Sequence, residues 1–190
     1  MFSVGRQCTL ADAKVLLTTS ISDNDPVIFV ENLALYNTKG DVPEGDHCLE
    51  IGRACVVKEG TDLTIISYSR ITLVALDVAR RLEADEGISV EVVDLRSLRP
   101  LDRETIVASA RKTGRVVVME EDWLSYGIGA EVAATVQEGA FDYLDAPVRR
   151  VAAAEVPLPY SKPLELAALP SADALVRVVR ETLDAVNFRP

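Results

Sequence analysis

The chain has 190 residues, of which 48% are hydrophobic and 26% are charged, a balance typical of a folded globular protein with enough apolar side chains for a core. Its 30 acidic residues outnumber the 20 Lys and Arg, and the formal net charge of -10 disfavours binding to nucleic acid or to an anionic membrane. Every uncharged stretch is shorter than the roughly 20 residues that a membrane-spanning helix needs, so we expect no membrane span.

The first part of the chain combines a short ordered piece with a polar segment. Thr9 followed by Asp12 forms a helix-capping pattern, and apolar residues then recur at helical spacing, which predicts a helix over residues 10–21. A polar turn leads to a short strand at 27–30. The next stretch is polar, carries Gly and Pro and has no periodicity. These patterns predict three parts, namely a leading piece at 1–36, a linker at 37–46 and a main domain at 47–190.

Strands and helices alternate in the main domain. Short apolar segments predict four strands, at residues 63–68, 88–95, 116–119 and 147–152. Helical periodicity predicts a helix between each pair of strands, with Gly87 and Gly114 ending the first two and Asp102 capping the second, and a last helix from Ser171. This alternation implies a parallel sheet covered on both faces, so the fold class is α/β.

The scarce residues disfavour several kinds of site. His47 is the only histidine and lies in the polar region, where an exposed turn residue is the usual role. Cys8, Cys48 and Cys55 form no Cys-x-x-Cys pair, which disfavours a disulfide framework and a structural zinc site and favours a reducing compartment. The first eight residues lack the apolar core of a signal peptide and the Arg and Ser bias of a transit peptide, so we expect no secretion.

Two glycines invite a nucleotide-binding interpretation. Gly127 and Gly129 stand between a predicted strand and a predicted helix, but the third glycine of the dinucleotide-binding pattern is replaced by Val132. The pair also begins well beyond the end of the strand. Glycines that let the backbone enter a helix explain the pattern better.

Two charged groups are candidates for chemistry. The run of acids at 120–122 stands at a strand end, where a general acid or base is one interpretation and a solvated or subunit-facing strand end is the favoured one. Asp94, Arg96 and Arg99 suit either an anion clamp or local ion pairs. The residues by themselves therefore reveal no catalytic centre.

Five segments resemble the beta subunit of pyruvate dehydrogenase, a member of the 2-oxoacid dehydrogenase beta-subunit family. They match that family in order and spacing, and lie at 94–102, 112–121, 127–131, 144–148 and 156–160. Shorter upstream segments at 11–14, 25–29 and 35–37 are similar to the end of the subunit's pyrimidine-binding domain. Branched-chain 2-oxoacid and acetoin dehydrogenases share most of these motifs, whereas 144–147 and 157–160 resemble the pyruvate branch most.

The resemblance implies that residues 1–36 are a remnant of the pyrimidine-binding domain and that 47–190 are a transketolase C-terminal domain. That domain is a three-layer α/β/α structure with a mostly parallel five-stranded sheet, used for subunit assembly and partner docking. In the family, thiamine diphosphate and magnesium are bound by the complete complex, and the catalytic glutamate and histidine lie in the first half of the subunit. We therefore expect a truncated piece with no catalytic and no cofactor-binding residue, inactive alone.

The resemblance also implies two sites. Oxygens of Ser20, Ile21, Asp23 and Asp25 correspond to half of a potassium site, although an ordinary Asp-rich turn explains these residues equally well, and we expect weak or no occupancy. Asp145 and the carboxylate of Pro190 correspond to acceptors for arginines of a basic binding domain in the dihydrolipoyl acyltransferase. The alternative for Asp145 is a residue that only caps its turn.

The implied partners are the alpha subunit of the same dehydrogenase, this binding domain and a second copy of the chain, paired through a surface that includes Trp123 and Tyr126. The implied location is the bacterial cytoplasm, the mitochondrial matrix or a plastid. Two other hypotheses stay open at this point. The first is that the chain is a non-catalytic interaction module of its own. The second is that it is a nicotinamide oxidoreductase, which only the two glycines at 127 and 129 support.

Overall fold

The computed structural model describes residues 3–42, 44–45 and 49–185. Its centre is a five-stranded sheet in the order β3-β5-β4-β7-β8. The antiparallel pair is β3 with β5, and all other neighbours are parallel, which confirms the predicted mostly parallel sheet. The strands are β3 (Cys55–Lys58), β4 (Leu63–Ser67), β5 (Val90–Asp94), β7 (Val116–Trp123) and β8 (Arg149–Ala153).

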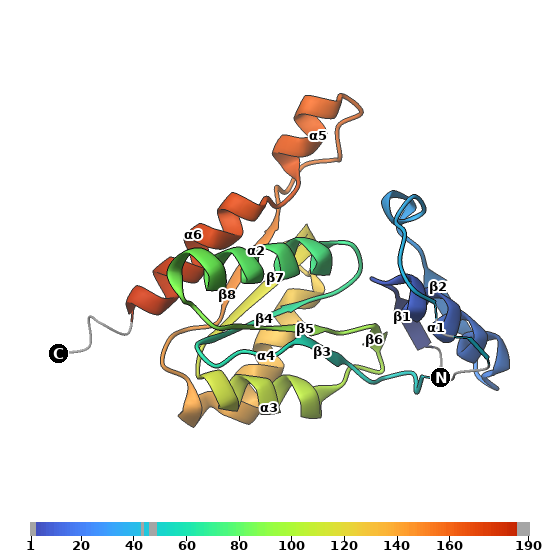
Figure 1. Ribbon diagram of the computed structural model, residues 1–190, viewed down its shortest axis with the longest axis horizontal. Helices are drawn as coiled ribbons and strands as arrows, with labels where there is room; N and C mark the ends of the chain where they lie inside the picture. The colour runs from blue at the N-terminus through green and yellow to red at the C-terminus, as the bar shows by residue number, and fades with distance from the viewer. Residues whose placement is uncertain (1–2, 43, 46–48, 186–190) are drawn as a thin grey trace.

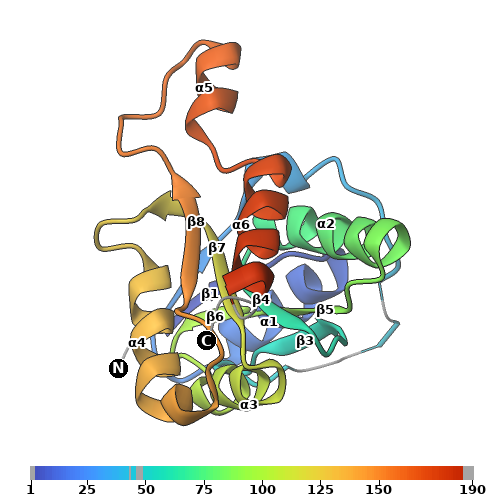
Figure 2. The same cartoon turned by 90° about the vertical axis from the view of Figure 1, so that its left-hand side faces the viewer.

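Helices cover both faces of this sheet (Figures 1 and 2). One hydrophobic cluster joins the sheet to α2 (Ile71–Glu86) and α6 (Ala172–Asp184), and the other joins it to α3 (Arg103–Thr113) and α4 (Ile128–Ala140). The central strands β4 and β5 are buried along their whole length, as expected for strands packed on both faces. The predicted three-layer α/β/α architecture is therefore confirmed.

The helix ends follow the capping residues seen in the sequence. Asp102 accepts a hydrogen bond from the backbone of Thr105 at the start of α3, and Thr9 accepts one from the backbone of Asp12 at the start of α1 (Leu10–Ser22). Gly87 and Gly114 end α2 and α3 in the left-handed region, at φ values of 69° and 68°.

A second, smaller sheet joins the leading piece to the main domain. It has the order β2-β1-β6, in which β1 (Ser3–Arg6) runs parallel to β2 (Val27–Val30) and antiparallel to β6 (Ser97–Arg99). The sequence did not predict β1, β3 and β6, because each has only three or four residues and ends in a Lys or Arg, whereas the equally short β2 is wholly apolar. The division at 37–46 stays a prediction, and His47, Cys48 and Pro190 lie outside the described residues.

Beyond β8 the chain leaves the body of the domain (Figures 1 and 2). Residues 154–170, called the arm from here on, project from the sheet and contain α5 (Lys162–Ala168), a helix that the pattern reading also missed. The remaining elements are two short 3-10 helices, η1 (Leu33–Leu35) and η2 (Phe141–Tyr143). Among the described residues, no helix has the length and apolar character needed to cross a bilayer.

Candidate functional site

The buried carboxylate of Glu120 lies at the N-terminus of α4. It accepts a hydrogen bond of 2.7 Å from the backbone of Gly129 and forms a 2.7 Å ion pair with Arg150 on β8. A helix N-terminus attracts anions because its first backbone N–H groups are unpaired and its dipole is positive there. The chain's own glutamate therefore occupies the place that a phosphate takes in a dinucleotide site.

This arrangement explains the two glycines. A Cβ at Gly129 would lie 2.3 Å from Oε1 of Glu120, and a Cβ at Gly127 would lie 2.3 Å from the carbonyl oxygen of Trp123. Glycine is needed at both positions so that the strand end and the helix start approach closely. The interpretation of the pair as glycines at a helix entrance is confirmed, and the observation that supported a nicotinamide oxidoreductase is accounted for by packing.

The three adjacent acids point to three different partners. Glu121 binds Arg70 and accepts a hydrogen bond of 3.3 Å from Asn32, whereas Asp122 accepts one of 2.8 Å from the hydroxyl of Tyr68. Burial, assisted by Asp122, raises the pKa of Tyr68. The prediction of a solvated strand end is wrong for Glu120, which is fully buried and paired. None of the three carboxylates is poised as a general base.

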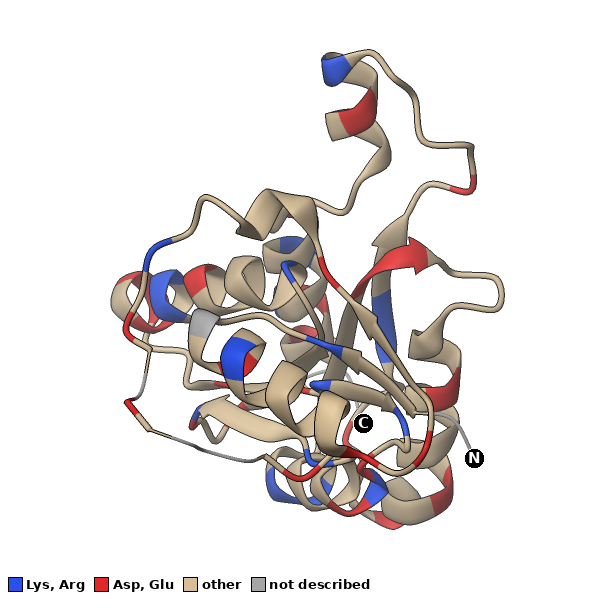
Figure 3. Cartoon of the chain, turned by 90° about the vertical axis from the view of Figure 1, so that its right-hand side faces the viewer, with Lys and Arg blue, Asp and Glu red and all other residues tan. Residues whose placement is uncertain are grey.

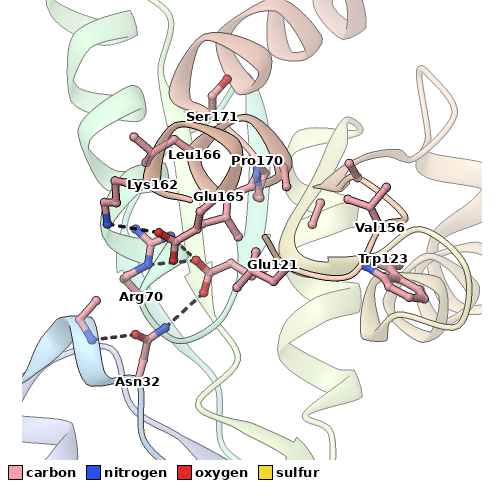
Figure 4. A pocket seen from close by; sticks show the side chains of 16 residues that line it. Asn32, Arg70, Glu121, Trp123, Val156, Lys162, Glu165, Leu166, Pro170 and Ser171 are labelled. Carbon is pink, nitrogen blue, oxygen red and sulfur yellow. Dashed lines mark hydrogen bonds and ion pairs between the residues drawn. The ribbon is translucent and has the colours of Figure 1, made fainter. Parts of the chain in front are cut away.

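A cavity of about 570 Å³ opens between the arm and the carboxyl ends of β7 and β8 (Figure 4). Its charged side chains pair with one another, Arg70 with Glu121 and Lys162 with Glu165. The remaining lining is mainly apolar and includes Trp123, Val156, Leu158, Leu166, Leu169 and Pro170. The cavity therefore suits an apolar partner segment better than a charged small substrate.

The arm and the neighbouring turn expose large apolar side chains. Trp123 is 45% exposed, and Tyr126 and Tyr160 are fully exposed. Figure 3 shows charged residues spread over the body of the domain, and the arm carries Glu155, Lys162 and Glu165 among mostly uncharged residues. Contiguous apolar surface of this kind marks protein interfaces. Sequence reasoning placed Trp123 and Tyr126 on such a surface and missed the contribution of the arm, which the alternating apolar residues at 156, 158 and 160 indicate.

Asp145 lies in the turn before β8, at the end of that strand opposite to the arm. Its carboxylate is 44% exposed and forms a 3.0 Å ion pair with Arg115, while its backbone N–H donates to the carbonyl of Gly114 at 2.8 Å. The residue therefore fixes its turn and still offers carboxylate surface to solvent. Glu138, an acid that precedes Asp145 by seven positions in the sequence, forms a 3.3 Å ion pair with Arg103.

The residues of the implied potassium site lie at the end of α1. The hydroxyl of Ser20 donates to the carbonyl of Leu16 at 2.6 Å, and the carboxylate of Asp23 accepts from the backbone of Asp25 at 2.8 Å. Ile21 and both aspartates are exposed. These contacts belong to an Asp-containing turn, and potassium binding by the four residues stays a prediction.

The pair Asp94 and Arg96 does not form an anion clamp. Arg96 forms a 2.7 Å ion pair with Asp12 of the leading piece, and its backbone N–H donates to Asp94 at 3.2 Å. Burial raises the pKa of Asp94 to about 6. Arg96 therefore forms an ion pair, but the prediction of a local partner is wrong, because Asp12 lies in the leading piece.

Known proteins that are similar to this chain contain the same kind of domain. Residues 52–175 match the family model of the transketolase C-terminal domain. The chain is 49% identical over 170 residues to the mitochondrial pyruvate dehydrogenase E1 component subunit beta-1 of Arabidopsis thaliana, covering 87% of the chain and 47% of that relative. It is 48% identical over 170 residues to the pyruvate dehydrogenase E1 component subunit beta of Rickettsia bellii, covering 90% of the chain and 52% of that relative.

A solved structure described as a split gene transketolase, inactive beta4 tetramer, superposes with a TM-score of 0.79 at 32% identity, covering 97% of the chain and 58% of that structure. The chain spans about half the length of the curated relatives that it matches. The matched range includes every strand of the central sheet and the helices between them. The chain belongs to the transketolase C-terminal domain family.

Proposed function

We propose that the chain is the C-terminal part of the beta subunit of a thiamine-diphosphate-dependent 2-oxoacid dehydrogenase, with pyruvate as the substrate of the complete enzyme. The identity of 49% and 48% to relatives named pyruvate dehydrogenase E1 beta subunits, over 87% and 90% of the chain, carries this proposal. A branched-chain 2-oxoacid or acetoin dehydrogenase subunit, and an interaction module of its own, are the alternatives. The proposed location is a bacterial cytoplasm, a mitochondrial matrix or a plastid, and a relative named as mitochondrial and one from a bacterium support the first two.

In this proposal the chain contributes assembly and docking, and the rest of the complex holds thiamine diphosphate and magnesium. Glu120, Glu121 and Asp122 at the carboxyl edge of the sheet are held by Arg150, Arg70 and Tyr68, so a cofactor at this edge would have to compete with these partners for the carboxylates. If the cofactor is held elsewhere in the complex, the isolated chain is expected to lack catalytic activity.

We expect the purified chain to bind thiamine diphosphate weakly or not at all and to leave pyruvate unchanged. Proton transfer and cofactor binding need groups within hydrogen-bond reach of the cofactor, and the resemblance places those groups in the first half of the family's subunit. Calorimetry with thiamine diphosphate and magnesium, followed by an assay of pyruvate decarboxylation, checks both points. Measurable turnover by the chain alone would contradict the proposed division of labour.

Docking to the acyltransferase is proposed to use Asp145 and the carboxylate of Pro190, with a net charge of -10 that favours encounter with a basic domain. The 44% exposed carboxylate of Asp145 supports this role, because an incoming arginine can bind it beside Arg115. Asp145→Ala is expected to weaken binding about tenfold, since the pair is only partly desolvated.

The measurement is a calorimetric titration of the acyltransferase binding domain into the wild type and the variant at two salt concentrations. Asp142→Ala is the matched control, because Asp142 is an exposed acid in the neighbouring 3-10 helix and is expected to change affinity little. Equal affinities of wild type and Asp145→Ala, or no binding by either, would remove Asp145 from the docking site. Loss of wild-type binding at high salt is the accompanying expectation.

Self-association is proposed through the surface that contains Trp123, Tyr126 and the arm. Its exposed apolar side chains are the supporting observation. We expect sedimentation velocity to show a dimer that Tyr126→Ser weakens. The control is Phe141→Ser, which removes an exposed aromatic side chain from η2, on a different part of the surface. A wild-type chain that stays monomeric at high concentration would count against this interface.

A further inference from the structure

Three side chains from separate parts of the chain meet in the interior. Cys8 follows β1, Asp12 lies in the first turn of α1, and Asp94 ends β5. The sulfur atom and one oxygen atom of each carboxylate all lie within 4.8 Å of one another, and all three residues are buried. Thiolate and carboxylate are ligands for divalent ions of the zinc type.

One atom in this group lacks the partner that burial demands. Oδ1 of Asp94 accepts a hydrogen bond of 3.2 Å from the backbone of Arg96, whereas Oδ2 is fully buried without a hydrogen-bond partner. A buried carboxylate oxygen left in this way is costly unless another group compensates it. Besides the neighbouring Cys8 thiol, a bound cation is a group that can compensate this oxygen, and the observation is separate from the closeness of the three ligand atoms.

The local charge also favours a cation. The positively charged side chain at this group is Arg96, which pairs with Oδ1 of Asp12 at 2.7 Å. Once the thiol has lost its proton on binding, two carboxylates and a thiolate opposite one guanidinium carry two net negative charges, which a divalent ion neutralises. Asp12 keeps its hydrogen bond from the Thr9 hydroxyl, because each carboxylate oxygen has a second lone pair.

A route to the thiol is present. A cavity of about 250 Å³ is lined by Cys8, by Gln7 and by residues of η1 and the following turn, among them Leu35 and Tyr36. Gln7 is 5% exposed, and its Oε1 atom also lacks a hydrogen-bond partner. Cys8 lines this cavity whereas Asp12 and Asp94 do not, so an ion would approach the group from the side of the thiol.

We propose that Cys8, Asp12 and Asp94 bind a thiophilic divalent cation of the zinc class and thereby tie the leading piece to the main domain. As the sulfur–metal bond forms, the thiol proton passes to water, so binding releases a proton. Tetrahedral zinc–sulfur bonds of about 2.3 Å and zinc–oxygen bonds of about 2.0–2.2 Å place ligand atoms about 3.4–3.6 Å apart, so atoms separated by up to 4.8 Å must draw closer by as much as about 1.4 Å. Magnesium is excluded as the preferred ion because it favours oxygen ligands alone.

The test is a titration of the full chain with cobalt(II) chloride under a phosphine reductant. A thiolate ligand gives a sulfur-to-cobalt charge-transfer band in the near ultraviolet, and we expect this band to reach a plateau at one cobalt per chain and to disappear when zinc is added. Asp94→Asn and Cys8→Ser are expected to weaken cobalt binding at least about tenfold. Cys55→Ser is the matched control, because Cys55 is the cross-strand neighbour of Asp94 but is outside the three-residue group.

Circular dichroism of each variant shows whether it is folded, and the wild-type titration remains decisive if a variant is not. A folded wild-type chain without a charge-transfer band would overturn the proposal. A band that survives Cys8→Ser, or that Cys55→Ser removes, would overturn the ligand assignment. A zinc-induced rise in the melting temperature of the wild type, absent in Asp94→Asn, is the second expected result. These outcomes do not depend on the proposed dehydrogenase function.

Discussion

Arg150→Ala is expected to lower the free energy of unfolding by about 3–5 kcal/mol, because it leaves the buried carboxylate of Glu120 without its counter-charge. Arg150 is 18% exposed in its side chain, and its Nη2 atom lies 2.7 Å from Oε1 of a glutamate that is fully buried. The backbone N–H of Gly129 then remains as the carboxylate's hydrogen-bond donor. Urea unfolding followed by circular dichroism measures the loss.

The preceding residue provides the matched control. Arg149 pairs with Glu181 at 3.1 Å, and both side chains are about half exposed, so Arg149→Ala is expected to cost much less. A double variant, Glu120→Gln with Arg150→Met, has no buried charge and retains an acceptor for Gly129, so it should be more stable than Arg150→Ala alone. Equal losses for Arg150→Ala and Arg149→Ala would show that the buried pair contributes no more than the surface pair.

Gly60→Ala is expected to destabilise the domain by about 3 kcal/mol through a clash with the backbone of a central strand. A Cβ at Gly60 would lie 2.1 Å from the backbone nitrogen of Glu91 and 2.2 Å from the carbonyl carbon of Val90. That backbone cannot move freely, because β5 is hydrogen-bonded to β4 on one side and to β3 on the other. The substitution therefore strains the pairing of the sheet itself.

Gly5→Ala is the control for this substitution. Gly5 is buried like Gly60 and lies in β1, but a Cβ there would meet its nearest neighbour, Cδ2 of Phe29, at 3.7 Å, an ordinary contact distance. We expect Gly5→Ala to retain the stability of the wild type or to gain slightly, because alanine loses less backbone entropy on folding. Thermal and urea unfolding measure the stability of both variants. A Gly60→Ala protein as stable as the Gly5→Ala protein would refute the predicted clash.

The layered architecture and the family were both predictable from the sequence. The period of the apolar residues predicts α2 and the last helix, and Thr9, Asp102, Gly87 and Gly114 mark helix ends, because capping and periodicity depend on neighbours within a few residues. The motifs that resemble the beta subunit lie in strands, turns and helix starts of this domain, and their order along the chain can be read without coordinates.

Contacts between residues that are distant in the sequence became visible only in the folded structure. Arg150 and Glu120 are 30 positions apart, Arg70 and Glu121 are 51 apart, and Asp12 reaches Arg96 from the leading piece. The same holds for the arm's cavity, for the pairing of β6 with β1 and for the meeting of Cys8 with Asp94. No local pattern encodes these contacts, because they depend on where crossovers bring strand ends together and on which side chains burial then forces to find partners.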